Sequence, residues 1–196
     1  VNLGEKVNLG DKVAVIGGGN VAMDAVRVAV RTGSKEVFIL YRRTRAEMPA
    51  SPEEIEEAIE EGVEMKFLVA PKRVVGKDGK VTGIECTRME LGEPDASGRR
   101  RPVEIKGSEF IIECDAIVPA IGQEADLSFI TKESGVSINK WNNVDFDKVT
   151  YATNVPGIFT GGDVSTGPQT VVKAVYSGKE AAKSIDRYLR GEDMKA

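Results

Sequence analysis

Apolar and polar positions along residues 11–41 follow the order of a strand, a helix and a second strand. Residues 11–16 (DKVAVI) are rich in Val and Ile, which is typical of a buried parallel strand. After GGGN at 17–20, polar residues repeat at helical spacing along one stripe: Asn20, Asp24, Arg27 and Arg31. Gly33 lies where a helix commonly ends, and residues 35–41 (KEVFILY) predict a second buried strand. The pattern therefore predicts one βαβ unit.

A second helix is predicted over residues 51–64 (SPEEIEEAIEEGVE). Ser51 can act as the N-cap, Pro52 as the first helical residue, Glu54 as the partner at the third position and Gly62 as the end. The acidic face of this helix is most simply a solvated surface.

Residues 65–121 change character, because short strand-like runs alternate there with turn signals. KDGK at 77–80 is a two-residue hairpin signal, and EPDASGRR at 93–100 is a longer turn signal. We interpret this stretch as an antiparallel meander that rejoins the parallel sheet at residues 115–122. Arg99, Arg100 and Arg101 are expected in an exposed turn and not in a phosphate site.

The glycines after the first strand form the pattern Gly17-x-Gly19-x-x-Ala22. In a dinucleotide fold the first glycine permits a tight turn, the second lets a pyrophosphate approach the backbone, and the third position packs the helix on the strand. The helix N-terminus, with Asn20 and Val21, adds free N–H groups and a partial positive charge. The alternative is a glycine turn that binds nothing.

Arg42, Arg43 and Arg45 follow the second strand, where an NAD-binding unit places an acid for the ribose 2′-hydroxyl. NADP carries a 2′-phosphate at that point, which an acid repels and arginine binds. The chain has no acid there until Glu47. The pattern favours NADP(H), and the alternative is a solvated basic turn offset by the acidic helix.

The amino-acid composition excludes several kinds of catalytic and metal site. The chain of 196 residues has no histidine and a net charge of −4, which excludes histidine-based catalysis and gives no general reason to bind nucleic acid or an anionic membrane. Cys86 and Cys114 are the only cysteines, so we expect no iron–sulfur, zinc or other metal site, no disulfide, and two small buried side chains in a cytoplasmic protein. A cofactor would carry any redox chemistry.

Three segments together resemble a known family: residues 17–50 (GGGNVAMDAVRVAVRTG…YRRTRAEMPA), 115–123 (DAIVPAIGQ) and 153–182 (TNVPGIFTGGDVSTGPQTVVKAVYSGKEAA). They resemble the NADPH-dependent glutamate synthase small (β) subunit and related flavin-dependent NADPH oxidoreductases of the pyridine nucleotide-disulfide oxidoreductase type. The resemblance implies an α/β fold. Residues 11–121 would form a Rossmann-like NADPH-binding domain with an inserted antiparallel meander, and residues 122–196 the C-terminal part of an FAD-binding domain.

The resemblance also implies flavin-binding residues. Residues 157–163 (GIFTGGD) predict a short strand running into two glycines and an acid. Gly162 permits close approach, and Asp163 would hold the ribityl chain; by itself Asp163 is equally well a turn acid. Gly122 lies in the domain crossover, and Gln169, Thr170 and Val171 would open the final helix toward the flavin ring.

The sequence departs from the family in having one glycine fingerprint where two are expected, and it begins with Val1 rather than Met. We therefore expect a fragment of a flavin-dependent oxidoreductase that holds a complete NADPH site and half of an FAD site. The missing part would be an N-terminal FAD and iron–sulfur portion, and a glutamate synthase large subunit or other redox partner would accept electrons. The chain alone should be inactive. No residue is assigned as catalytic, since hydride transfer between cofactors needs position and not a protein acid or base.

Two alternatives remain from the sequence. One is a ferredoxin:NADP oxidoreductase subunit of the same superfamily. The other is a non-catalytic dinucleotide-binding module that uses the acidic helix, residues 53–61, to dock a partner.

Overall fold

The computed structural model describes residues 4–95 and 98–195, and the chain divides into two compact units. Unit 1 is Val1–Ile121 and unit 2 is Gly122–Ala196. The elements of unit 1, in chain order, are β1 (Lys12–Ile16), α1 (Asn20–Arg31), β2 (Glu36–Tyr41), η1 (Arg45–Glu47), α2 (Pro52–Glu60), β3 (Glu64–Phe67), β4 (Val69–Lys77), β5 (Lys80–Pro94), β6 (Arg100–Glu104), β7 (Phe110–Glu113) and β8 (Ala116–Pro119).

A parallel sheet with the strand order β3-β2-β1-β8 forms the centre of unit 1. The predicted βαβ unit over residues 12–41 is confirmed, with α1 joining β1 to β2. Asp115 fixes the start of this sheet, because its Oδ2 accepts hydrogen bonds from the backbone N–H groups of Asp11 (2.8 Å) and Lys12 (2.9 Å). Thr32 caps α1, and Gly33 follows it with φ +103°, as the sequence predicts.

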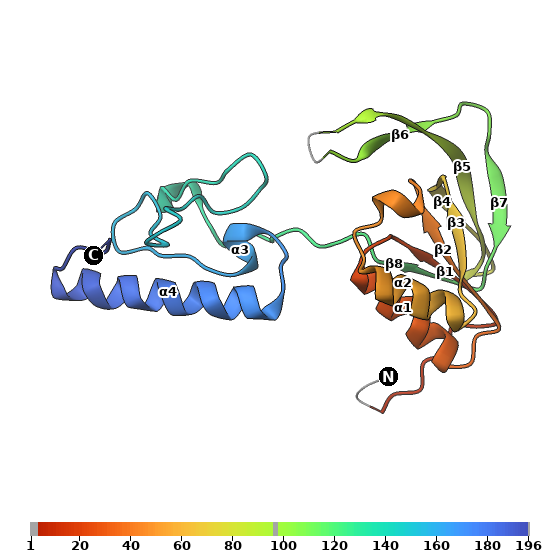
Figure 1. Cartoon of the computed structure of the whole chain (residues 1–196), viewed down its shortest axis with the longest axis horizontal. Coiled ribbons are helices and arrows are strands. Elements are labelled where there is room, and N and C mark those ends of the chain that lie inside the picture. Colours follow the sequence, from red (N-terminus) through yellow and green to blue (C-terminus); the bar gives the residue numbers. More distant parts are fainter. Residues whose placement is uncertain (1–3, 96–97, 196) are drawn as a thin grey trace. The chain divides into compact units, whose positions relative to one another are not determined.

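Both faces of the parallel sheet are buried, which explains why its strands are apolar along their whole length. Val15 and Ile39 face α1 and α2, where they pack with Met23. The alternate residues of the strands face the opposite way: Ala14, Phe38 and Leu40 pack with Ile84, Cys86 and Cys114. Figure 1 shows the resulting order of layers, with the helices on one side and the second sheet on the other.

The second sheet is antiparallel, with the order β4-β5-β6 and with β7 also paired to β5. The predicted antiparallel insert and its KDGK hairpin are confirmed: Lys77 pairs with Lys80 across Asp78 (φ +52°) and Gly79 (φ +75°). The prediction of a simple meander is wrong, because β7 pairs with β5 and not with the preceding strand β6. Residues 96–97 of the predicted longer turn lie outside the described residues.

The structure divides one strand-like run that the sequence presents as continuous. Leu68 has φ +55° and interrupts residues 65–76, so that β3 joins the parallel sheet and β4 joins the antiparallel one. A left-handed residue turns the chain out of one sheet and into the other.

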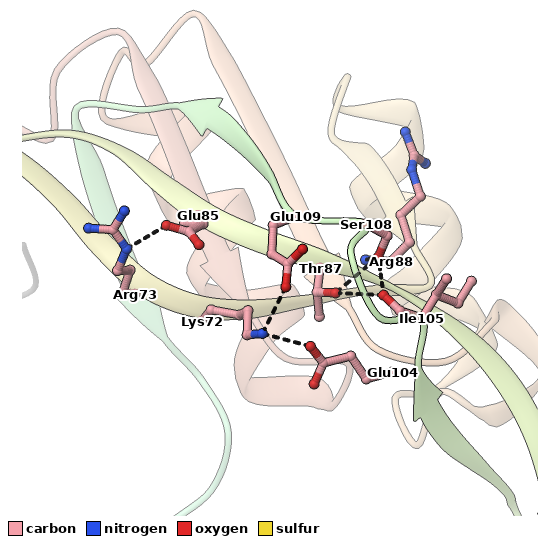
Figure 2. A network of polar contacts seen from close by, with 9 residues as sticks. All are labelled: Lys72, Arg73, Glu85, Thr87, Arg88, Glu104, Ile105, Ser108 and Glu109. Atoms are coloured by element: carbon pink, nitrogen blue, oxygen red, sulfur yellow. Dashed lines mark hydrogen bonds and ion pairs between the residues drawn. The ribbon is translucent and has the colours of Figure 1, made fainter.

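Polar contacts cover the antiparallel sheet on the side shown in Figure 2. Lys72 donates to Glu104 (2.7 Å) and Glu109 (3.2 Å), which ties β4 to the end of β6 and to the segment between β6 and β7. Thr87 shares a hydrogen bond with Ser108 (3.0 Å), and Arg73 pairs with Glu85. The charges along β4 also discourage pairing of this edge strand with another chain.

The acidic helix α2 begins as predicted, with Ser51 accepting a hydrogen bond from the backbone N–H of Glu54 at 3.3 Å. Its face is not simply solvated. Arg27 donates to Glu57 (2.5 Å) and Glu61 (2.9 Å), and Arg31 donates to Glu61 at 2.7 Å. These bonds lower the pKa of the Glu61 carboxyl. The polar stripe of α1 therefore serves to dock α2.

Unit 2 contains η2 (Lys132–Ser134), α3 (Asp163–Thr166) and α4 (Val171–Arg190), joined by long loops. The predicted helix start at residues 169–171 is confirmed, with Thr170 as the N-cap of α4. The strand expected at 157–160 is wrong as stated, because Phe159 forms one isolated bridge with Ala152. In the described residues of either unit, no helix has the length and apolar character needed to cross a membrane.

Candidate functional site

The turn between β1 and α1 is shaped by two glycines that face protein atoms. Gly17 has φ +143°, and a Cβ there would collide with the carbonyl oxygen of Ala120. A Cβ on Gly18 would lie 2.6 Å from the ring of Tyr41. The sequence pattern assigned no role to Gly18, and its partner is the aromatic residue at the end of β2. Both glycines let the turn pack closely against neighbouring strands.

Gly19 differs, because the protein leaves room beside it. A Cβ on Gly19 would meet only the Pro49 ring, at 3.8 Å, and φ of Gly19 is −96°, which any residue adopts. Within the described residues, the backbone N–H groups of residues 18–21 donate to no protein acceptor. Four unpaired donors and open space at the start of a twelve-residue helix favour an anion.

Asn20 and Val21 stand at the first turn of α1, as expected. The Oδ1 atom of Asn20 accepts the backbone N–H of Ser51 at 3.0 Å, so its side chain links α1 to the N-cap of α2. Val21 is 68% exposed, which is unusual for a valine and leaves an apolar surface beside the glycine turn.

The segment after β2 is held in a defined turn. The hydroxyl of Tyr41 donates to the carbonyl oxygen of Glu47 at 2.7 Å. Thr44 donates to Glu47 Oε2 through its backbone N–H (3.0 Å) and its hydroxyl (2.6 Å), which is a capping box. The bond from the Thr44 hydroxyl holds the pKa of the Glu47 carboxyl below its ordinary value, although burial acts in the opposite direction.

The three arginines of this turn have different surroundings. Arg42 is exposed, and no described residue forms a hydrogen bond or ion pair with its guanidinium. Arg43 is 5% exposed, and it donates to Asp95 Oδ2 and to the carbonyl oxygen of Arg100, both at 2.7 Å. Arg45 pairs with Glu56 at the surface. The structure thus leaves Arg42 available to a ligand and gives Arg43 partners inside the protein.

The two arginines follow each other in the bend after β2, and no local pattern in the sequence tells which of them is buried. Tyr41 is buried, Arg42 exposed and Arg43 buried. The expectation that Arg100 and Arg101 lie in a turn is wrong, since they begin β6. Arg100 donates to the carbonyl oxygens of Gly92 and Leu91, and its own carbonyl accepts from Arg43.

Unit 2 contains a cleft of about 330 Å³, and Asp163 is the one predicted flavin residue among the described residues that line it. Asp163 lines it together with Gln123 and Phe129, and its side chain is exposed. Asp163 Oδ1 accepts the backbone N–H of Gln169 at 3.2 Å, which joins the two predicted residues ahead of α4. Gly162 has φ +71°, and its N–H donates to Ser177 of α4 at 2.7 Å. Gly122 (φ +101°) begins the unit and faces open space.

The profile of the pyridine nucleotide-disulphide oxidoreductases matches residues 2–178. The chain belongs to this family. The resemblance expected from the sequence is thereby confirmed, and pyridine nucleotide-disulphide oxidoreductases use NAD(P)H with FAD.

Individual members of the pyridine nucleotide-disulphide oxidoreductase family are also similar to this chain. The β subunit of an NADP(+)-dependent formate dehydrogenase from Moorella thermoacetica is 54% identical over 92% of the chain and 25% of the relative. The small chain of glutamate synthase [NADPH] from Azospirillum brasilense is 41% identical over 93% of the chain and 38% of the relative. Thioredoxin reductase from T. acidophilum superposes with a TM-score of 0.72 at 25% identity, over 92% of the chain and 52% of that structure. The chain therefore spans a quarter to about two fifths of the length of these two curated relatives.

Proposed function

We propose that unit 1 binds NADP(H) and prefers it to NAD(H). The observation that carries this proposal is Arg42, an exposed cation without a protein partner in the described residues, at the carboxyl end of β2. In a dinucleotide fold that position faces the adenosine ribose. The unpaired N–H groups beside Gly19 would receive the pyrophosphate.

Arg42 would contribute one or two charge-assisted hydrogen bonds to the 2′-phosphate, each worth about 1.5–3 kcal/mol before solvent exposure weakens it. The expected preference for NADPH over NADH is roughly 10- to 100-fold, since about 1.4 kcal/mol corresponds to a factor of ten. Arg45 is a weaker contributor, because Glu56 already neutralises it. We assign Arg43 no direct contact with the 2′-phosphate, because its guanidinium bonds to Asp95 and to the carbonyl oxygen of Arg100.

The test is calorimetric titration of NADPH and NADH against the wild type and Arg42→Ala. Arg73→Ala is the matched control, since it removes the same charge from β4, where Glu85 pairs with Arg73. We expect Arg42→Ala to lose the preference and Arg73→Ala to keep it. Salt should weaken NADPH binding more than NADH binding, because only NADPH makes the additional phosphate contact. Equal affinities in the wild type would contradict the proposal.

Unit 2 contributes part of a flavin site in this proposal. Asp163 would accept hydrogen bonds from the ribityl chain, and the N-terminus of α4 at Thr170 and Val171 would face the flavin ring. The residues fit this group, because Asp163 is exposed at a cleft and Gly162 leaves space beside it. FAD, when bound, would accept the hydride that NADPH supplies.

The whole protein would be a flavin-dependent NADPH oxidoreductase similar to the glutamate synthase small subunit. An upstream portion, absent from this chain, would bind the ADP half of FAD and carry iron–sulfur centres that pass electrons to a partner subunit. The binding-module alternative is less well supported, because Glu56, Glu57 and Glu61 of the acidic segment already pair with arginines of unit 1.

An absorbance spectrum and an NADPH oxidation assay with an artificial acceptor test the flavin proposal. The isolated chain should purify without stoichiometric FAD and show negligible oxidation. Robust activity of the isolated chain would contradict it and would mean that the residues of unit 2 suffice to bind FAD.

A further inference from the structure

The charged side chain of Arg43 is buried, and its hydrogen-bond partners lie more than fifty residues further along the chain. Its guanidinium donates to Asp95 Oδ2 through Nη2 and to the Arg100 carbonyl through Nε, both at 2.7 Å. Its own carbonyl oxygen accepts the backbone N–H of Leu68 at 3.1 Å. Arg43 is thus fixed at both its side chain and its main chain.

The side-chain partners of Arg43 belong to the hairpin that joins β5 to β6. β5 is fifteen residues long, and its second half pairs with β6 and not with β7. Through Asp95 and Arg100 this hairpin bonds to the side chain of Arg43, two residues after the end of β2. An element of the inserted sheet therefore contacts the turn that carries Arg42.

We propose that Asp95 is a positioning residue for NADP(H) selectivity: by holding Arg43 inward it directs Arg42 outward to the 2′-phosphate. Arg42 and Arg43 are adjacent residues in the bend that follows β2, with Arg42 exposed and Arg43 buried. Because Arg43 is bonded through both its side chain and its main chain, it also fixes the backbone from which Arg42 projects. Asp95 also neutralises Arg43, which removes the repulsion between two adjacent cations. This inference rests on the proposed function of unit 1.

A competing explanation makes the opposite prediction. If Arg43 bound the phosphate directly after leaving Asp95, then removing the Asp95 charge would free it and tighten NADPH binding. The loss of a negative charge near the site would also tighten NADPH binding through the general field. A weaker NADPH complex is therefore diagnostic of positioning.

The experiment is calorimetric titration of NADPH and NADH against the wild type, Asp95→Asn, Arg42→Ala and the double variant. We expect Asp95→Asn to raise the Kd for NADPH about tenfold and to leave that for NADH unchanged. In the Arg42→Ala background the same change should add nothing, because Asp95 acts through Arg42. Asp78→Asn, at the turn between β4 and β5, is the matched control and should change neither Kd.

The outcomes separate this inference from the function on which it rests. A wild type with equal affinities overturns the NADP(H) proposal and this one with it. A wild type whose preference depends on Arg42, together with Asp95→Asn that keeps or strengthens the preference, overturns only the positioning role. The positioning role is also overturned if Asp95→Asn weakens NADPH binding in the Arg42→Ala background, or if it weakens NADH binding as much as NADPH binding.

Two conservative variants keep the test decisive if Asp95→Asn does not fold. Arg43→Lys keeps the charge but can make only one of the two bonds, so it should weaken NADPH selectively. Asp95→Glu keeps the carboxylate and should retain most of the preference for NADPH over NADH. Arg43→Lys with wild-type selectivity would overturn the proposal.

Discussion

Unit 1 and unit 2 differ in how much apolar surface each buries by itself. Unit 1 packs a parallel sheet between two helices and a second sheet, with fully buried residues such as Met23 and Ile39. In the described part of unit 2 the buried apolar residues are Leu127, Val144 and Ala181. The long helix α4 buries Ser177, Ala181 and Ser184, which are all small.

Unit 2 also exposes several large apolar side chains. Those more than 60% exposed are Phe129, Trp141, Val149, Val171, Val172 and Leu189. The comparison shows that unit 1 forms two apolar clusters by itself, whereas the described part of unit 2 buries three apolar side chains.

The largest expected effect concerns folding of the two units as separate polypeptides. We expect residues 1–121 to unfold cooperatively and to give a dispersed amide NMR spectrum, because their core is closed. Residues 122–196 should lack a cooperative thermal transition and should bind a hydrophobic dye. A dispersed amide NMR spectrum from residues 122–196 alone would show that unit 2 folds by itself and would contradict the predicted difference between the units.

Single substitutions in the two units should lower the free energy of unfolding by amounts that differ several-fold. Ile39→Ala removes a fully buried side chain of β2 and should lower the free energy of unfolding by about 2–5 kcal/mol. Leu189→Ala, at a position on α4 that is 77% exposed, should change it by less than about 0.5 kcal/mol. Urea titration followed by circular dichroism measures both, and similar costs would show that α4 is covered in solution.

The smallest expected effect concerns the reactivity of the two cysteine thiols, which reports on unit 1 alone because both cysteines lie there. Burial raises the pKa of Cys86 to about 11 and also raises that of Cys114. The folded protein should therefore keep neutral thiols at pH 8 and react with a thiol reagent only after urea unfolds unit 1. Because the unfolded thiols ionise first, stability should fall as the pH rises above about 9. Rapid labelling of native protein at pH 8 would contradict this.

Local signals were enough to predict the βαβ unit, helix α2 and the hairpin between β4 and β5. The spacing of apolar residues, Ser51 as a cap, Gly33 as a stop and the KDGK turn all act within a few residues of chain, and the structure has each of them. Leu68 was missed because nothing in its neighbours distinguishes a left-handed leucine from one in a strand.

The candidate site was harder to predict because its side chains depend on distant partners. The glycine turn was predictable, since strand, turn and helix are contiguous. The inward direction of Arg43 is stabilised by Asp95, 52 residues further on, which no local pattern indicates. Gly18 owes its place to the ring of Tyr41, which is also remote in the chain.

Strand β8 has a consequence for the order in which the chain can fold. It pairs with β1, as Val13 with Ala116, and about fifty residues of inserted sheet separate it from β3. During synthesis at roughly 5–20 residues per second, β1 therefore presents an unpaired edge for about 2–10 s after β3 has emerged. An unpaired strand edge can pair with a neighbouring chain, so we expect slower translation through the insert to lower the yield of folded protein.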